Sequence, residues 1–157
     1  MRLLWSVYLI RLKGTAKMVA PTKNKKFDPN LPCPCGSGLT YGACCCDYLE
    51  HGKNVTEGPL TVLRTRFVAY KLGFYDYVLR SWHPDYRPKI KPQIIAKEGK
   101  GIVYTKLEAG LPQVQGEQGF IEYNALFRAQ NGFGKLHEKA RFLMHDGVWY
   151  YADGIVD

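Results

Sequence analysis

The chain has 157 residues, which suits one domain of ordinary size with room for a small accessory module. Hydrophobic residues make up 46% of it and charged residues 23%, a composition typical of a globular protein with a buried core and not of a disordered chain. The longest apolar run near the start, residues 3–10, is less than half the roughly 20 residues that a membrane-spanning helix needs. No transmembrane segment is therefore expected.

The formal net charge of +8 lies mostly at the start of the chain. Residues 1–27 contain seven lysines and arginines and no acid, which leaves +1 for residues 28–157. A main domain that is nearly neutral has no broad basic field for phosphates. We therefore expect no specific nucleic-acid recognition by the main domain.

Residues 1–32 are predicted to be a basic N-terminal extension followed by a polar, proline-bearing linker. Within residues 1–27, apolar side chains recur on one side of a helix and acids are missing, which is typical of an organelle-targeting presequence. The alternative is a flexible extension upstream of an internal start at Met18. The expected location is the cytoplasm, with mitochondria or plastids as the alternative if the extension is a targeting segment.

All five cysteines lie within residues 33–46. Their odd number and the lack of a convincing export signal disfavour a disulfide framework. Several of them are adjacent or one residue apart, so a bridge between neighbours would close a strained ring. A catalytic thiol would need a base close by, and His51 is the sole local candidate. A metal site is therefore the favoured interpretation.

Four of the cysteines suit a closed tetrahedral site. Cys33 and Cys35 fall on one tight turn, and Cys44 and Cys45 follow after a return of eight residues that begins with two glycines able to adopt positive φ. Zinc accepts four thiolates at about 2.3 Å, and iron can occupy the same four sulfurs. Because no coordination position stays open, such a site is structural or serves docking, and Cys46 is the spare thiol.

The stretch CPCGSGLTYGACC, residues 33–45, resembles the SEC-C motif, a zinc-binding module of the bacterial preprotein translocase ATPase and of several small proteins. The resemblance implies zinc on the four cysteines and a protein partner, with the export or translation machinery as the candidate. The sequence departs from the motif at Leu39 and Gly42, where lysines are common. We call residues 33–50 the knuckle.

Beyond the knuckle, the pattern predicts helices followed by antiparallel strands. Apolar residues at helical spacing predict a helix from Pro59 to a break at Gly73, and a second short helix that ends before Pro84. Turn signals then separate the expected strands. Their ranges are 93–97, 101–108, 119–128, 136–145 and 148–153, the last two joined by an Asp-Gly hairpin turn. This order predicts an α+β domain with helices packed on one sheet face.

That order also resembles the nuclear transport factor 2-like cone, in which helices close over a curved sheet. Residues 33–154 resemble the YchJ-like family of uncharacterised proteins, which joins a SEC-C knuckle to such a cone. The stretches that carry this resemblance are LRTRFVAY, SWHP, GFIEYNALFR, HEKARF and GVWYYADG. It implies a cone over residues 57–157 and brings no established reaction with it. Because the two parts have separate hydrophobic patterns, we expect the cone to stay folded when Cys33 or Cys45 is replaced.

One acid falls on an apolar strand face. Strand alternation places Glu138 with Leu136, Ala140 and Phe142, and Arg66 lies at the edge of the apolar helix face. One hypothesis makes Glu138 a general acid/base, with Arg66, His83 or His137 orienting a substrate. The favoured alternative is a buried Glu138–Arg66 ion pair that fixes the helix against the sheet. The expected pocket lining is Phe67, Tyr70, Trp82, Phe142, Trp149 and Tyr151.

These observations leave three functions open. The favoured one is a metal-binding adaptor whose knuckle docks a protein partner, with a cone that holds a small ligand or only supports the knuckle. The second is a small-molecule enzyme that uses the cone pocket around Glu138, and the third is a subunit of a large organelle assembly. The adaptor is favoured over an enzyme because it alone explains a closed metal module.

Overall fold

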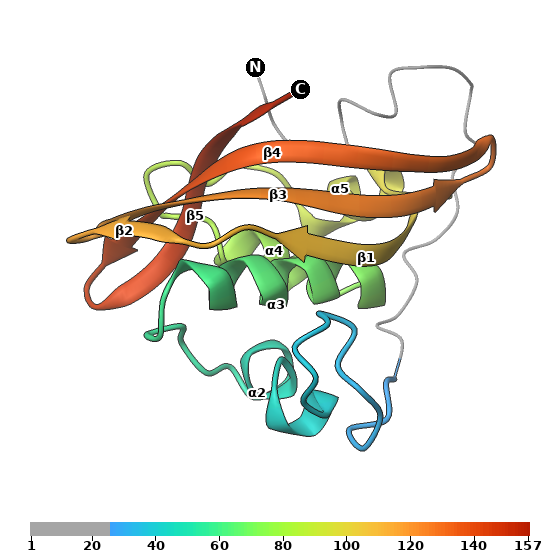
Figure 1. The fold of residues 1–157 in the computed structure, drawn as a ribbon, viewed down its shortest axis with the longest axis horizontal. Helices are drawn as coiled ribbons and strands as arrows, with labels where there is room; N and C mark the ends of the chain where they lie inside the picture. The colour runs from blue at the N-terminus through green and yellow to red at the C-terminus, as the bar shows by residue number, and fades with distance from the viewer. Residues whose placement is uncertain (1–25) are drawn as a thin grey trace.

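The computed structural model describes residues 26–157, so the predictions for the basic extension concern residues that lie largely outside the described part of the chain. The described residues form three layers (Figure 1). A curved antiparallel sheet makes the first layer, helices make the second, and the knuckle lies against the helices on the side away from the sheet. This is the α+β, nuclear transport factor 2-like architecture that the sequence predicts.

The knuckle contains little regular structure. A bridge between Pro32 and Thr40 joins its two short antiparallel segments. The 3-10 helix η1 (Tyr41–Ala43) and the four-residue helix α2 (Cys46–Leu49) follow. A module of this size has too few apolar residues for an independent core, so it needs a metal, a packing partner or both.

Three helices form the middle layer: α3 (Pro59–Leu72), α4 (Tyr75–Arg80) and α5 (Pro92–Glu98). Pro59 starts α3 at a position where its missing N–H would have had no helical partner. Gly73 ends it in the left-handed conformation, with φ 87°, and donates its N–H to the Ala69 carbonyl. No helix of the described part of the chain is long and apolar enough to cross a membrane.

Helix α3 is the centre of the molecule. Ten of its fourteen residues are buried, and they surround the helix instead of forming one stripe. It packs against β1, β3 and β5 on one side and against α4 and α2 on the other. A helix with apolar residues on all sides is stable in water only when neighbours cover both faces.

The sheet is antiparallel, with strands in the order β1-β3-β4-β5. The strands are β1 (Val103–Ala109), β2 (Gln113–Gln115), β3 (Gln118–Ala129), β4 (Gly132–His145) and β5 (Val148–Val156). The short β2 pairs with β3 along the same edge as β1. Asp146 and Gly147 both have positive φ, which confirms the two-residue hairpin turn between β4 and β5.

Two irregularities in the pairing curve the sheet around α3. One lies in β1 between Tyr104 and Lys106, and the other lies where β5 passes Arg141 and Phe142 of β4. Bulges increase local twist and bend a strand, so they help the sheet to close over the helix. The inward face of β4 carries Glu138 among apolar residues, as the alternation predicts.

The structure differs from the predicted elements at three places. Residues 93–97 form the helix α5 and not a strand, because Pro92 starts a helix and only Ile95 is buried. The helix after Gly73 ends at Arg80, and the segment before Pro84 pairs beside β5 instead, with the backbone N–H of His83 donating to the Tyr151 carbonyl at 2.7 Å. Strand β2 lies inside the stretch that the sequence assigned to a turn.

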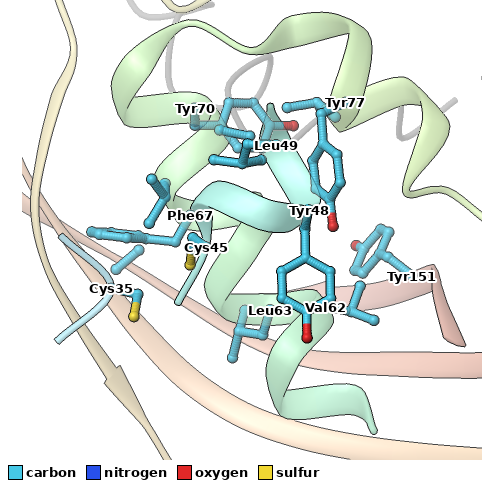
Figure 2. Packing of buried hydrophobic residues seen from close by; sticks show 14 of the residues in the cluster. Cys35, Cys45, Tyr48, Leu49, Val62, Leu63, Phe67, Tyr70, Tyr77 and Tyr151 are labelled. Atoms are coloured by element: carbon cyan, nitrogen blue, oxygen red, sulfur yellow. The ribbon is translucent and has the colours of Figure 1, made fainter. Parts of the chain in front are cut away.

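The knuckle and the cone share one core, although their hydrophobic patterns in the sequence are separate. One continuous cluster of buried side chains runs from the knuckle through α3 to the sheet. Figure 2 shows Cys35, Cys45, Tyr48 and Leu49 gathered with side chains of α3 and α4. The Tyr48 hydroxyl donates to the Glu57 carboxylate at 2.6 Å, and the backbone N–H of Trp149 donates to the Val55 carbonyl at 2.8 Å. The knuckle is thus packed onto the cone.

Gly154 of β5 lies directly against the buried Glu138 side chain. A Cβ at Gly154 would overlap the Glu138 carboxylate and lie 2.9 Å from its Cγ. We therefore predict that Gly154→Ala lowers the free energy of unfolding by about 2–3 kcal/mol through overpacking. Chemical denaturation measures this loss.

The matched control is Gly99→Ala, whose Cβ would meet only the Ile95 carbonyl at 3.4 Å. This control should stay within about 1 kcal/mol of the parent chain. Equal stability of the two variants would contradict the close packing of Gly154 on Glu138.

Candidate metal centre and buried acid cluster

Four cysteine sulfurs converge at one point of the knuckle. The Sγ atoms of Cys33, Cys35, Cys44 and Cys45 all lie within 4.8 Å of one another. The Cys35 and Cys44 sulfurs are 3.6 Å apart, and those of Cys44 and Cys45 are 3.9 Å apart. All four are free thiols. The structure therefore brings together the four residues that the spacing selects.

The local backbone explains this convergence. Gly36 and Gly38 have φ values of 80° and 86°, a left-handed conformation that disfavours side chains. Their turn carries the chain back so that Cys33 donates its N–H to the Leu39 carbonyl at 2.8 Å. The 3-10 turn that follows then brings Cys44 and Cys45 beside the first pair.

The sulfur spacing fits a tetrahedral metal. A zinc ion with four thiolates at about 2.3 Å requires sulfur–sulfur edges of about 3.8 Å, and the two distances above lie on either side of that value. The residues present therefore fit a four-coordinate zinc ion held by all four thiolates. Such an ion would hold two chain segments together and offer no open position for a substrate.

Crowding of the sulfurs affects their protonation. A hydrogen bond from Cys33 is the main cause that lowers the pKa of Cys35 to about 2. The contact between Cys33 and Cys35 also raises the pKa of Cys33 to about 11. Hydrogen bonds with Cys33 and then Cys35 raise the pKa of the Cys45 thiol well above its usual range. Metal binding must therefore displace protons, so affinity falls as the pH is lowered.

Cys46 lies apart from the four. Its Sγ donates to the Glu50 carboxylate at 3.2 Å, and burial is the main cause that raises its pKa to about 11. A buried thiol in that state is a poor nucleophile. Its position agrees with the expectation that it is the spare cysteine.

Glu138 is the central residue of a second cluster, inside the cone. Its side chain is 0% exposed, and its carboxylate accepts hydrogen bonds from the hydroxyls of Tyr123 and Tyr151. Burial raises the pKa of Glu138, while the two tyrosines and then Arg66 act in the opposite direction. Sequence reasoning missed Tyr123, although cross-strand alternation would place it opposite Glu138 on the same face.

Arg66 is also 0% exposed and lies inside the same cone. Its Nη1 donates to the Val78 carbonyl at 3.1 Å and to Ser81 Oγ at 2.7 Å, which ties α3 to the end of α4. Its guanidinium carbon lies 4.3 Å from the ring centre of Tyr151, which also hydrogen-bonds Glu138. The structure thus places Arg66 and Glu138 in one buried cluster, where the arginine charge acts on the carboxyl group.

The two histidines proposed to orient a substrate, His83 and His137, lie outside the Glu138 cluster. His137 precedes Glu138 in β4 and points to the opposite, outer face of the sheet, where it bonds Glu122 at 2.8 Å and also Asp157. His83 packs with the rings of Tyr86, His145 and Tyr150. The structure therefore does not bring His137 into the cone, and it places His83 in a third group of side chains.

The side chains expected to line a pocket are buried. Each of Phe67, Tyr70, Trp82, Phe142, Trp149 and Tyr151 has less than a tenth of its surface exposed. A groove of about 370 Å³ lies elsewhere, at the seam between knuckle and helices. Its lining residues are Leu49, Glu50, Phe74, Asp76, Tyr77 and Arg80.

Comparison with known proteins identifies both parts of the chain, the knuckle and the cone. Residues 30–45 match the SEC-C motif, and residues 58–154 match the family described as YchJ, middle NTF2-like domain. The chain belongs to the YchJ (UPF0225) family. Among its UPF0225 relatives, a Vibrio vulnificus protein is 36% identical over 126 residues, covering 78% of this chain and 73% of the relative. A Deinococcus radiodurans protein is 34% identical, covering 87% and 98%.

Two solved structures show the same arrangement as this UPF0225 chain. A SEC-C motif containing protein from Rhodopseudomonas palustris has a TM-score of 0.72 and 27% identity, covering 78% of this chain and 96% of the other. A second, from Psychrobacter arcticus, has a TM-score of 0.67 and 20% identity, covering 77% and 80%, and supports the fold alone.

The His137 ion pairs make the end of β5 in this UPF0225 chain sensitive to pH. Hydrogen bonds that the His137 ring donates to the carboxylates of Asp157 and then Glu122 raise the pKa of His137, and the same contact lowers the pKa of Asp157. The stabilising contribution of His137 is full below its unfolded pKa of about 6.5 and is lost as the pH rises through the higher folded pKa. We predict that the protection of the Asp157 and Ile155 amides from hydrogen exchange falls over this rise.

His137→Gln is the control, because it keeps the ring position polar but cannot become charged. Its protection factors should be lower than those of the parent near pH 6 and should change little as the pH rises. A parent profile as flat as that of the variant would show that the ion pairs do not hold β5.

Proposed function

We propose that this protein binds one zinc ion through Cys33, Cys35, Cys44 and Cys45, and that the zinc-bound knuckle docks a protein partner. The observation that carries the proposal is the set of four sulfurs within 4.8 Å of one another, two pairs of which are separated by about the length of a tetrahedral edge. Four thiolates with no open position suit a structural ion, and zinc is preferred over iron because it needs no redox partner. The cytoplasm is the proposed location.

The surface of the knuckle supports a docking role. Leu39 of the knuckle and Leu31, just before the knuckle, lie on the two segments joined at the Pro32–Thr40 bridge, and they are 54% and 48% exposed. Neighbouring exposed apolar side chains can serve as contact points for a protein partner. The SEC-C resemblance makes the translation or export machinery the partner class to test.

The enzyme alternative has weaker support. A general acid/base must reach its substrate, and the Glu138 carboxylate is fully buried and already bonded to two tyrosines. A buried acid held in this way is sufficient to fix β4 against β3 and β5. We therefore assign the cone a supporting role.

The metal part of the proposal is tested by elemental mass spectrometry of the purified chain. We expect one zinc per chain, with less than about a tenth of that content in Cys45→Ser, because loss of one thiolate weakens zinc binding and releases one of the two chain segments that the ion would join. Cys46→Ser is the matched control, since this neighbouring thiol bonds Glu50 and should leave the metal content unchanged. A chain without stoichiometric metal, or equal loss in both variants, would refute the zinc site.

The docking part is tested by cosedimentation with purified bacterial ribosomes and with vesicles that contain the export translocase. We expect the parent chain to bind one of the two. Leu39→Glu places a charge at the contact and Cys45→Ser removes a metal ligand of the knuckle, so both variants should bind at least about 10-fold more weakly. Leu111→Glu is the control, because Leu111 is 91% exposed on a cone loop. Binding to neither, or equal binding by all variants, would refute docking through the knuckle.

A further inference from the structure

One polar side chain outside the four cysteines points at their sulfurs. Ser37 Oγ lies 3.3 Å from the Sγ of Cys44. The same oxygen accepts a hydrogen bond from the Leu39 N–H at 3.2 Å. Because that N–H uses a lone pair of the oxygen, the hydroxyl hydrogen is left to point elsewhere. The sulfur of Cys44 is an acceptor within reach, and the Ser37 hydroxyl also acts on the thiol of Cys35.

Cys44 is also the most accessible of the four cysteines. It is half-buried, whereas Cys33, Cys35 and Cys45 are 4%, 3% and 1% exposed. A ligand that faces solvent is the one that a competing chelator reaches first. The hydroxyl of Ser37 thus meets the sulfur through which a bound metal is most easily lost.

The conformation of the turn explains how Ser37 reaches this position. It stands between Gly36 and Gly38, which both have left-handed φ values. Neither glycine would place a Cβ near another atom, so space does not require them. Their role is conformational: two left-handed residues in the turn aim the serine between them at the cysteines.

We propose that Ser37 is a positioning residue of the metal centre, whose hydroxyl donates a hydrogen bond to the Cys44 thiolate and thereby slows loss of the metal. This inference rests on the proposed zinc site. The hydrogen bond fixes the orientation of the exposed thiolate and compensates part of its charge on the solvent side. Outer groups that orient a metal ligand typically contribute 10–100-fold in affinity.

The test measures the rate at which the purified, zinc-loaded chain releases its metal to a chromogenic chelator. We expect Ser37→Ala to release zinc about 10–100-fold faster than the parent, because its Cys44 thiolate loses the donor. Ser37→Thr keeps the hydroxyl and should restore slow release. Thr40→Ala is the matched control, since it removes a hydroxyl from the same turn without removing a bond to sulfur.

A second readout reports on the thiolates directly. In the cobalt-substituted chain, losing a hydrogen bond makes a thiolate easier to oxidise. The sulfur-to-cobalt charge-transfer band of Ser37→Ala should therefore move to lower energy, and that of Thr40→Ala should not. This readout separates a lost bond to sulfur from a general loosening of the turn.

The outcomes separate this inference from the proposal on which it rests. A parent chain that holds no metal overturns both. A parent with one zinc and a Ser37→Ala variant that releases it at the parent rate, with an unmoved cobalt band, overturns the role of Ser37 and leaves the zinc site standing. Equal acceleration in Ser37→Ala and Thr40→Ala also overturns it, because the effect would then belong to the turn.

Discussion

Helix α3 has apolar side chains on all sides, and this requires a cover on both of its faces. The curved sheet covers one face, and α4 and the knuckle cover the other (Figure 1). The knuckle has too little apolar surface to hold its own shape, and its four sulfurs, all within 4.8 Å of one another, are placed so that a bound metal would fix it. On this view the metal site is part of the core, because it shapes one wall around α3.

The cone interior is held by polar contacts as well as by packing. Glu138 and Arg66 are both fully buried, and each would cost several kcal/mol there without partners. Tyr123 and Tyr151 donate to the carboxylate, and Ser81 and the Val78 carbonyl accept from the guanidinium. These bonds join three strands and two helices. The Arg66 guanidinium, which lies over the Tyr151 ring, brings the two sets of bonds together.

Much of this could be predicted from the sequence. The cysteine spacing selected the four converging sulfurs, and strand alternation placed Glu138 inside the sheet. The errors came from short segments: α5 is too short to show a helical period, and Pro92 was a stronger signal than its two isoleucines. The partners of buried groups depend on strand register and on packing between distant segments, as with Tyr123. The shared core was missed because separate sequence patterns say nothing about how two modules pack.

The most direct test of the account follows hydrogen exchange of the α3 amides in the zinc-loaded chain and after chelation. If the metal shapes the wall that covers α3, stripping it should lower α3 protection at least about 10-fold and more than that of the β3–β4 amides, which pair with each other. Freely exchanging knuckle amides beside an unchanged α3 would show that the knuckle is an appendage, and would contradict the account.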